Sequence, residues 1–346
     1  MEGVKIVENL RDQLMALPKV ELHLHLDGSV NPETILELAQ KEGIDLPTEN
    51  LDELRRYLEV PEDCKSLGEY LQKFEFPLAV MQTKEGLKRI AYELCERVAK
   101  ENVRYFEVRF APQLHTRKGL TLNEVVEAVL DGLNEGKREF NVKAGLILCA
   151  MRHQPVEINL EIADLAARFK EKGVVAVDLA GDEANFPVED HAEVFERAKA
   201  SGLHITIHAG EAAGAQSVAK AIELGAERIG HGVRSFEDPE VLAKLKEKKI
   251  LLEVCPKSNR HTKAVRNISE HPVKEYFDKG IRVSINTDNR TVSNTSLTDE
   301  YQLVMEELGF TVDEIKKMIL YAAETVFLPE SERDQLVQEI KAELDL

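Results

Sequence analysis

The chain has 346 residues, of which 43% are hydrophobic, an ordinary share for a globular protein with a large core. Its formal net charge is −18, from 45 Lys and Arg residues against 63 Asp and Glu residues, and the basic residues form no dense stretch. This balance argues against nucleic acid or an anionic membrane as a partner, because both bind clustered Lys and Arg side chains.

Strand-like segments alternate with amphipathic helical segments along most of the chain. The segments expected to be strands are residues 19–26, 103–111, 143–151, 174–180, 204–209, 228–231, 250–255 and 282–288. The helical segments between them are residues 84–101, 121–139, 157–171, 188–200, 215–225 and 239–248. Eight strands separated by helices are the pattern of a (β/α)8 TIM barrel, an α/β fold.

Two regions lie outside this alternation. Residues 31–83 are too many for one crossover between parallel strands, so we expect a helical lid insertion over the C-terminal mouth of the barrel. Residues 297–323 and 330–344, after the last strand, are predicted to be helical. No linker or shift of composition divides the chain, and we therefore interpret residues 1–346 as a single domain.

Two histidines lie on the same face of the first predicted strand. His23 and His25 are two residues apart, and side chains alternate between the faces of a strand, so both imidazoles point to one side. Imidazole is the commonest metal ligand in proteins. A lone histidine near a strand end is more often structural, but His208, His231 and Asp288 also end predicted strands. In a barrel these ends meet at one face, where barrel enzymes place their active sites.

Polar side chains also follow one face of the later strands. Glu107 and Arg109 share a face of the second strand, Thr206 and His208 share a face of the fifth, and the opposite faces are apolar. The apolar faces should pack on the helices, so the polar faces look into the barrel. Buried polar groups need partners, and we expect a bound metal and a hydrogen-bonding ligand to supply them.

Four of the strand-end residues are suited to hold one metal ion. Three imidazoles and one carboxylate come from strands one, five and eight: His23, His25, His208 and Asp288. In a closed barrel strands one and eight are neighbours and strand five lies across the bore, so these donors can converge on a catalytic metal. The metal would make hydroxide available near neutral pH. The donor set suits zinc and is also compatible with iron, cobalt or manganese.

Two further residues are suited to the chemistry. Glu211, three residues after His208, is placed to exchange a proton with a substrate, and His231 is placed to hold the attacking hydroxide. Asp27 and Gly181 are equally compatible with simple turns at strand ends. The other histidines are expected to be structural or surface residues, mostly in loops and on helices: His115, His153, His191, His204, His261 and His271.

Five motifs along the chain resemble the family of metal-dependent adenosine and AMP deaminases, which are amidohydrolase-type barrels. The motifs are PKVELHLHLDG at 18–28, DLAGDE at 178–183, HAGE at 208–211, GHG at 230–232 and SINTD at 284–288. They occur in the family's order and span nearly the whole chain. The resemblance implies a (β/α)8 metallohydrolase with one zinc ion per chain. It also implies hydrolytic deamination of adenosine and 2′-deoxyadenosine to inosine and 2′-deoxyinosine plus ammonia, in purine salvage.

The same resemblance implies roles for individual residues. It assigns zinc binding to His23, His25, His208 and Asp288. It assigns proton delivery at the purine N1 to Glu211, orientation of the attacking hydroxide to His231, and acceptance of its proton or hydrogen bond to Asp288. Substrate contacts are expected from His25, Asp27, Gly181 and Asn289, with Gly181 at the purine N3 and Asp27 at the ribose 5′-hydroxyl.

Asn289 departs from the pattern of many family members, which have a second aspartate after the one that binds metal. In the family that carboxylate faces the purine N7, which is an acceptor, so the carboxylate must be protonated to donate. An Asn amide donates without taking up a proton. We therefore interpret Asn289 as a functional replacement and not as the sign of an inactive enzyme.

Several alternatives stay open at this point. Other barrel hydrolases hold two metals bridged by a lysine at the end of strand four, but residues 174–180 contain no lysine, which favours one metal. Asp27 favours a nucleoside over adenine itself, and modified adenine nucleosides remain compatible. AMP is disfavoured because no phosphate-binding cluster can be assigned, although four loop arginines are candidates: Arg117, Arg152, Arg260 and Arg290. A catalytically silent nucleoside-binding barrel is disfavoured because every expected ligand and Glu211 are present.

The cysteines and the N-terminal residues bear on the compartment. The four cysteines have no short spacing, so we expect neither a disulfide framework nor a cysteine zinc site, and a reducing compartment fits. No signal peptide is visible, and no apolar run approaches the roughly 20 residues of a membrane helix. We expect a cytoplasmic protein that acts on a small molecule, and no protein partner can be inferred.

Overall fold

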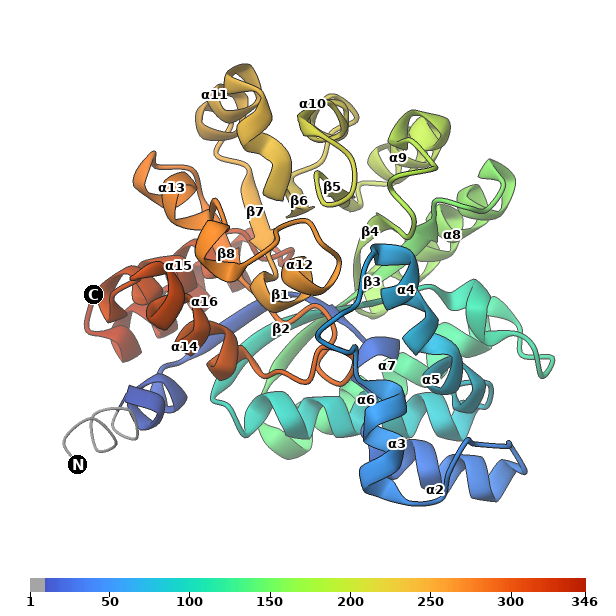
Figure 1. Ribbon diagram of the computed structural model, residues 1–346. Helices are drawn as coiled ribbons and strands as arrows, with labels where there is room; N and C mark the ends of the chain where they lie inside the picture. The colour runs from blue at the N-terminus through green and yellow to red at the C-terminus, as the bar shows by residue number, and fades with distance from the viewer. Residues whose placement is uncertain (1–9) are drawn as a thin grey trace, which may run out of the picture.

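Eight parallel strands pair in sequence order and curve into a nearly closed barrel (Figure 1). The computed structural model describes residues 10–346. The strands are β1 (Lys19–His25), β2 (Val103–Phe110), β3 (Lys143–Met151), β4 (Val174–Ala180), β5 (His204–Ala209), β6 (Arg228–His231), β7 (Leu251–Val254) and β8 (Val283–Ile285). The chain after β8 closes the ring onto β1, because the His25 N–H donates to the Asp288 carbonyl at 2.7 Å and the Asp288 N–H donates to the His23 carbonyl at 3.0 Å. The predicted fold class is confirmed.

Helices surround the barrel on its outer side (Figure 1). Those that cross between strands are α6 (Lys84–Ala99), α7 (Leu122–Phe140), α8 (Val156–Phe169), α9 (Ala192–Ala200), α10 (Ala215–Glu223), α11 (Pro239–Glu247), α12 (Pro256–His261) and α13 (Val273–Asp278). Those after the last strand are α14 (Leu297–Leu308), α15 (Val312–Glu324) and α16 (Glu330–Leu344). Short 3-10 turns are η1 (Asp27–Ser29), η2 (Gln72–Phe74), η3 (Pro112–His115), η4 (Lys170–Lys172), η5 (Val188–His191), η6 (Val233–Glu237) and η7 (Ile268–Glu270).

The long connection after β1 is helical. It contains α2 (Pro32–Glu42), α3 (Leu51–Leu58), α4 (Leu67–Leu71) and α5 (Glu75–Val80). Tyr70 on α4 is buried, and its hydroxyl lies 2.8 Å from Oγ of Ser293 in the segment after β8. This contact fastens α4 to the C-terminal edge of the barrel. Whether the helices move as a lid stays a prediction.

Ion pairs fill the middle of the barrel. Arg109 on β2 bonds to Asp178 on β4 at 3.0 Å and to Glu253 on β7 at 2.8 Å. Arg228 on β6 bonds to Glu253 at 2.6 Å and also pairs closely with Glu107. All five side chains are at most 1% exposed. The inward polar face was predicted correctly, but these groups satisfy one another, so a metal and ligand are needed only nearer the mouth.

The structure differs from the sequence prediction mainly after β7. Two short helices, α12 and α13, lie between β7 and β8 where we predicted none. The segment 297–323 forms two helices, because Gly309 takes a left-handed conformation (φ +72°) that ends α14, and Thr311 caps the start of α15. Of the described residues, no helix is long and apolar enough to cross a membrane.

Candidate metal centre and active site

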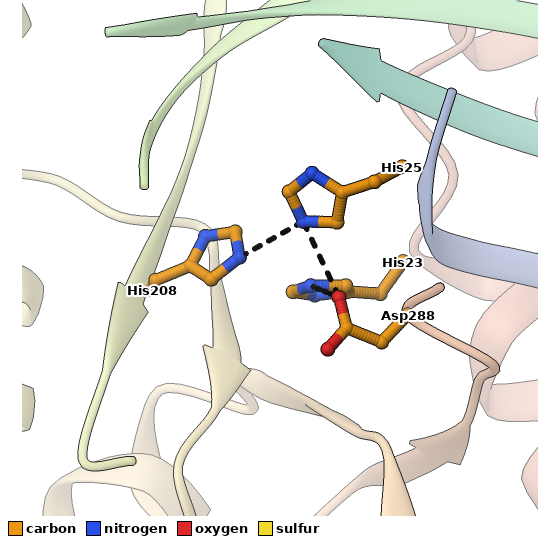
Figure 2. A group of neighbouring side chains, drawn as sticks. All are labelled: His23, His25, His208 and Asp288. Carbon is orange, nitrogen blue, oxygen red and sulfur yellow. Dashed lines mark hydrogen bonds and ion pairs between the residues drawn. The ribbon is translucent and has the colours of Figure 1, made fainter. Parts of the chain in front are cut away.

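Four side chains converge at the C-terminal end of the barrel. Figure 2 shows His23 and His25 from β1, His208 from β5 and Asp288 from the segment after β8 reaching toward one point. One donor atom from each lies within 4.8 Å of every other. The Nε2 atoms of His25 and His208 are 3.2 Å apart, and Oδ1 of Asp288 is 3.4 Å from Nε2 of both His23 and His25.

Hydrogen bonds behind the imidazoles aim their free nitrogens at this point. Glu253 lies 2.9 Å from Nδ1 of His23, and Asp178 lies 3.1 Å from Nδ1 of His208. A carboxylate there holds the proton on Nδ1 and leaves the Nε2 lone pair free. Nε2 of His23 is buried without a hydrogen-bond partner among the described residues. Burial also lowers the pKa of His23 to about 4, so its imidazole is neutral, as a metal ligand requires. The donor set therefore fits a metal ion.

Two of the site residues have strained backbones. His231 (φ +64°) and Asp288 (φ +60°) both adopt the left-handed backbone conformation, which residues other than glycine rarely take. Such strain concentrates at functional sites, where surrounding contacts hold the backbone in place. Here the left-handed backbone turns both side chains into the cavity at the mouth of the barrel.

Glu211 and His231 lie beside the convergent donors. Nε2 of His231 is 3.5 Å from Oε2 of Glu211, and Oε1 of Glu211 accepts the Thr262 hydroxyl at 2.8 Å. Glu211 is 7% exposed, and burial raises its pKa. A raised pKa favours the protonated carboxylic acid, which is the form that can give a proton to a substrate.

A second carboxylate holds the loop that carries Glu211. Glu183, after β4, accepts the backbone N–H groups of residues 210–213 at 2.6, 2.9, 2.7 and 3.0 Å, and the Ser217 hydroxyl at 2.6 Å. Successive N–H groups pointing at one position form a nest for an anion, and the Glu183 carboxylate occupies it. In the sequence Glu183 stands out only as the last residue of the motif at 178–183, and no local pattern indicates this contact.

A cavity of about 390 Å³ opens from the metal site to the surface, a size typical of sites for small molecules. One side is polar and contains every predicted substrate and proton-transfer residue: His25, Asp27, Gly181, Glu211, His231, Asp288 and Asn289. The other side is mostly apolar and comes largely from α4, η2 and α5: Leu67, Tyr70, Leu71, Phe74 and Leu78. The sequence did not single out these apolar residues. Their arrangement suits a flat, mostly apolar molecule with polar edges.

The three remaining predicted substrate contacts, Gly181, Asp27 and Asn289, differ in what holds them in place. Gly181 has φ +106°, which favours glycine and turns the chain at the end of β4. Asp27 is 6% exposed, and burial raises its pKa to about 7. Nδ2 of Asn289 donates to the Tyr70 hydroxyl at 2.9 Å. A Cβ on Gly28 would approach Oδ1 of Asn289 to 1.7 Å, so glycine is needed there for Asn289 to pack.

The four loop arginines that were candidates for binding a substrate phosphate do not line this cavity. Arg152 donates to backbone carbonyls of Phe186 and His208, Arg290 pairs with Glu21 and Glu101, and Arg260 pairs with Glu62. The backbone N–H of Arg117 donates to Gln82. Among the described residues, no Lys or Arg lines the cavity.

The remaining histidines were expected to be structural or surface residues, and four of them are buried inside the fold. His115, His191, His261 and His271 are at most 4% exposed. His191 bonds to the Arg152 carbonyl and to Asn159, and His271 bonds to Asn259. Buried histidines that bond to short loops leave no periodic pattern, so the sequence offered no signal for them. His153 lines the cavity, which the sequence also did not indicate.

Comparison with known proteins finds similarity over nearly the whole chain. The adenosine deaminase family model matches residues 18–343. The adenosine deaminase of Clostridium acetobutylicum is 46% identical over 333 residues, covering 96% of this chain and 99% of that protein. The structure of an adenine deaminase from Arthrobacter aurescens has a TM-score of 0.88 at 29% identity, covering 95% of this chain and all 100% of the other. An amidohydrolase from Burkholderia ambifaria, solved with bound Zn, has a TM-score of 0.87 at 25% identity, covering 97% of this chain and 93% of the other.

Proposed function

Because this chain belongs to the adenosine deaminase family, we propose that it hydrolyses adenosine and 2′-deoxyadenosine to inosine and 2′-deoxyinosine, with release of ammonia. The observation that supports this best is the cluster of three imidazoles and one carboxylate beside the buried acid Glu211, at the base of a cavity of nucleoside size. The reaction is a step of purine salvage.

We infer that His23, His25, His208 and Asp288 hold one zinc ion. When bound, the metal makes hydroxide available near neutral pH. Three imidazoles and a carboxylate are ligands that zinc accepts, and the amidohydrolase from Burkholderia ambifaria was solved with Zn.

Glu211 then acts as the acid. It gives its proton to N1 of the purine, which makes C6 electrophilic, and burial keeps that proton available. His231 hydrogen-bonds to the attacking oxygen, and Asp288 accepts the proton that this oxygen loses. Addition at C6 gives a tetrahedral carbon, the proton taken up by Asp288 passes to the amino group, which leaves as ammonia, and the 6-oxopurine remains with its proton on N1.

Substrate contacts come from the polar side of the cavity. We propose that the Gly181 backbone meets N3, that Asn289 donates to N7, that Asp27 meets the ribose 5′-hydroxyl and that His25 contacts the reacting end. The apolar side, from α4 to α5, would cover the purine face.

The cavity also bears on the alternatives. A 5′-phosphate needs cationic or multiple N–H donors, and no described Lys or Arg lines the cavity. This favours a nucleoside over AMP. Adenine remains the second candidate, because an adenine deaminase shares the fold over 95% of this chain. Asp27 separates the two, since the free base lacks the ribose hydroxyl that Asp27 would bind.

The direct test incubates the purified protein with adenosine, 2′-deoxyadenosine, adenine and AMP, with and without a metal chelator. Ammonia and the hypoxanthine-containing product are followed, and the metal is identified by elemental analysis. Chelator-sensitive turnover of the two nucleosides, with about one zinc per chain, is expected. Turnover of adenine alone would overturn the Asp27 assignment, and no turnover with zinc bound would overturn the proposed function. About two metals per chain would overturn the single-metal inference.

A further inference from the structure

Hydrogen bonds link three buried side chains in series, from His231 through Asn259 and His271 to the start of α13. Nδ1 of His231 lies 3.0 Å from Nδ2 of Asn259, and Oδ1 of Asn259 lies 3.2 Å from Nε2 of His271. Nδ1 of His271 lies 3.1 Å from the backbone N–H of Val273. His231, Asn259 and His271 are 1%, 0% and 4% exposed. His271 does not line the cavity, and the proposed function gives it no role.

The backbone N–H of Val273 fixes the direction of every hydrogen bond in this series. The N–H of Val273 can only donate, so Nδ1 of His271 must accept and carries no proton. A neutral imidazole then has its proton on Nε2, which donates to Oδ1 of Asn259. This turns the Asn259 amide nitrogen toward His231, where Nδ1 must accept in its turn.

Two other observations agree with this direction. Burial lowers the pKa of His271 to about 3, so its ring is neutral and has a single ring proton. The Nδ2 atom of Asn259 also lies 3.4 Å from Oε1 of Glu211, which is a second acceptor on the same side. If the Asn259 amide were reversed, its oxygen, which can only accept a hydrogen bond, would face these two acceptors.

From this geometry we propose that His271 and Asn259 are positioning residues that hold His231 in the tautomer with its proton on Nε2. This inference rests on the proposed function. In that tautomer His231 presents an N–H to the cavity and to Glu211, and it has no free lone pair on Nε2. Neutral His231 therefore stabilises the attacking oxygen by donating a hydrogen bond, and it does not remove that oxygen's proton. That proton goes to Asp288.

The first experiment measures the tautomer directly in the zinc-loaded protein. Histidine is labelled with ¹⁵N, and spectra are recorded at about pH 8.5, well above the ordinary pKa of imidazole. The signals of His231 are assigned by their disappearance in the variant His231→Gln. We expect a bare Nδ1 and a protonated Nε2. A protonated Nδ1 in the wild-type protein would overturn the proposal without any appeal to activity.

Variants then test which residues impose the tautomer. His271→Phe removes the donor to Asn259, and we expect a mixture of His231 tautomers and a fall in kcat of about tenfold or more, with KM changed by less than about threefold. His271→Gln retains an N–H donor near the Nε2 position and is expected to restore the single His231 tautomer and the wild-type kcat. His115→Phe is the matched control, because it removes another buried histidine, whose Nδ1 lies 3.0 Å from the Met81 carbonyl, and it should leave the His231 signals unchanged.

Asn259→Asp supplies an independent reading if His271→Phe does not fold. A carboxylate accepts from both rings, so the His231 proton should move to Nδ1. The proposal fails if His271→Phe keeps the wild-type tautomer, even with reduced kcat, or if Asn259→Asp keeps Nε2 protonated. Because the nitrogen spectra do not depend on any substrate, they still decide the proposal if adenosine is not deaminated.

Discussion

Oε2 of Glu183 accepts the backbone N–H of Glu211 at 2.9 Å, so one carboxylate holds another in place through the main chain. The two residues lie 28 positions apart and belong to different β–α loops. Glu183 also accepts N–H groups from the residues on both sides of Glu211. The position of the proposed acid therefore depends on a residue that does not line the cavity.

We predict that Glu183→Gln lowers kcat by about tenfold or more, because an amide NH₂ would face backbone N–H donors and cost roughly 1–3 kcal/mol. KM should change less than kcat, since the cavity walls stay in place. Steady-state kinetics with adenosine and thermal unfolding measure the two effects. The control Glu124→Gln removes a helix-capping carboxylate on α7 and should lower stability only. If Glu183→Gln lowers the Tm but leaves kcat normal, Glu183 supports the fold and does not position Glu211 for catalysis.

Asp178→Asn is predicted to weaken zinc binding by roughly 10- to 100-fold, because Asp178 fixes the ring of His208 through Nδ1. Competition with a chromophoric chelator measures the affinity. Glu107→Gln is the matched control, since it disturbs the same buried ion pairs through Arg228 but contacts no proposed ligand. Equal losses of zinc affinity in the two variants would contradict the role of Asp178.

Glu211→Gln is expected to bind zinc and fold normally while losing at least about 100-fold in kcat, because the amide cannot give a proton to N1. Zinc content and circular dichroism verify the folded, loaded protein, and ammonia release measures kcat. Normal turnover of this variant would contradict the acid role and reopen the question of which group protonates the purine.

Asn289→Asp is expected to remain active with an altered pH profile. A carboxylate at this position donates to N7 only when it is protonated, whereas the Asn amide donates at every pH. The Tyr70 hydroxyl, which now accepts from Asn289, can instead donate to a carboxylate, so the local packing tolerates the change. Profiles of kcat/KM against pH compare the two proteins. Inactivity of Asn289→Asp at every pH would show that a carboxylate cannot replace the amide here.

Glu300 should make stability depend on pH. Burial raises its pKa to about 8, while it accepts the Thr295 hydroxyl and the Lys257 N–H. Its ordinary pKa is about 4.3, so its neutral form stabilises the fold fully below that pH, and this contribution is lost as the pH rises through about 8. Glu300→Gln keeps a neutral side chain. Urea unfolding should show the variant gaining stability relative to wild type, by up to a few kcal/mol, between about pH 5 and pH 9. A constant difference between the two proteins across this range would contradict the raised pKa.

Much of this molecule follows from local patterns in the sequence. The eight strands were predicted within a few residues of their observed ends, because alternation of apolar and polar side chains is a local property of each strand. The same alternation placed His23 and His25 on one face, and the order of the strands in a barrel placed His208 and Asp288 near them. The ordered motifs indicated the family without any structure.

The residues that position the site were decided by the tertiary structure. Glu183, Asn259 and His271 act through contacts with loops and short helices from other parts of the chain. Helix α12, which carries Asn259, has six residues, too few for a helical period to appear in the sequence. Barrel closure brings the ends of all eight strands to one face, so partners far apart in sequence meet there. Which carboxylate accepts which N–H depends on that convergence, and no local pattern records it.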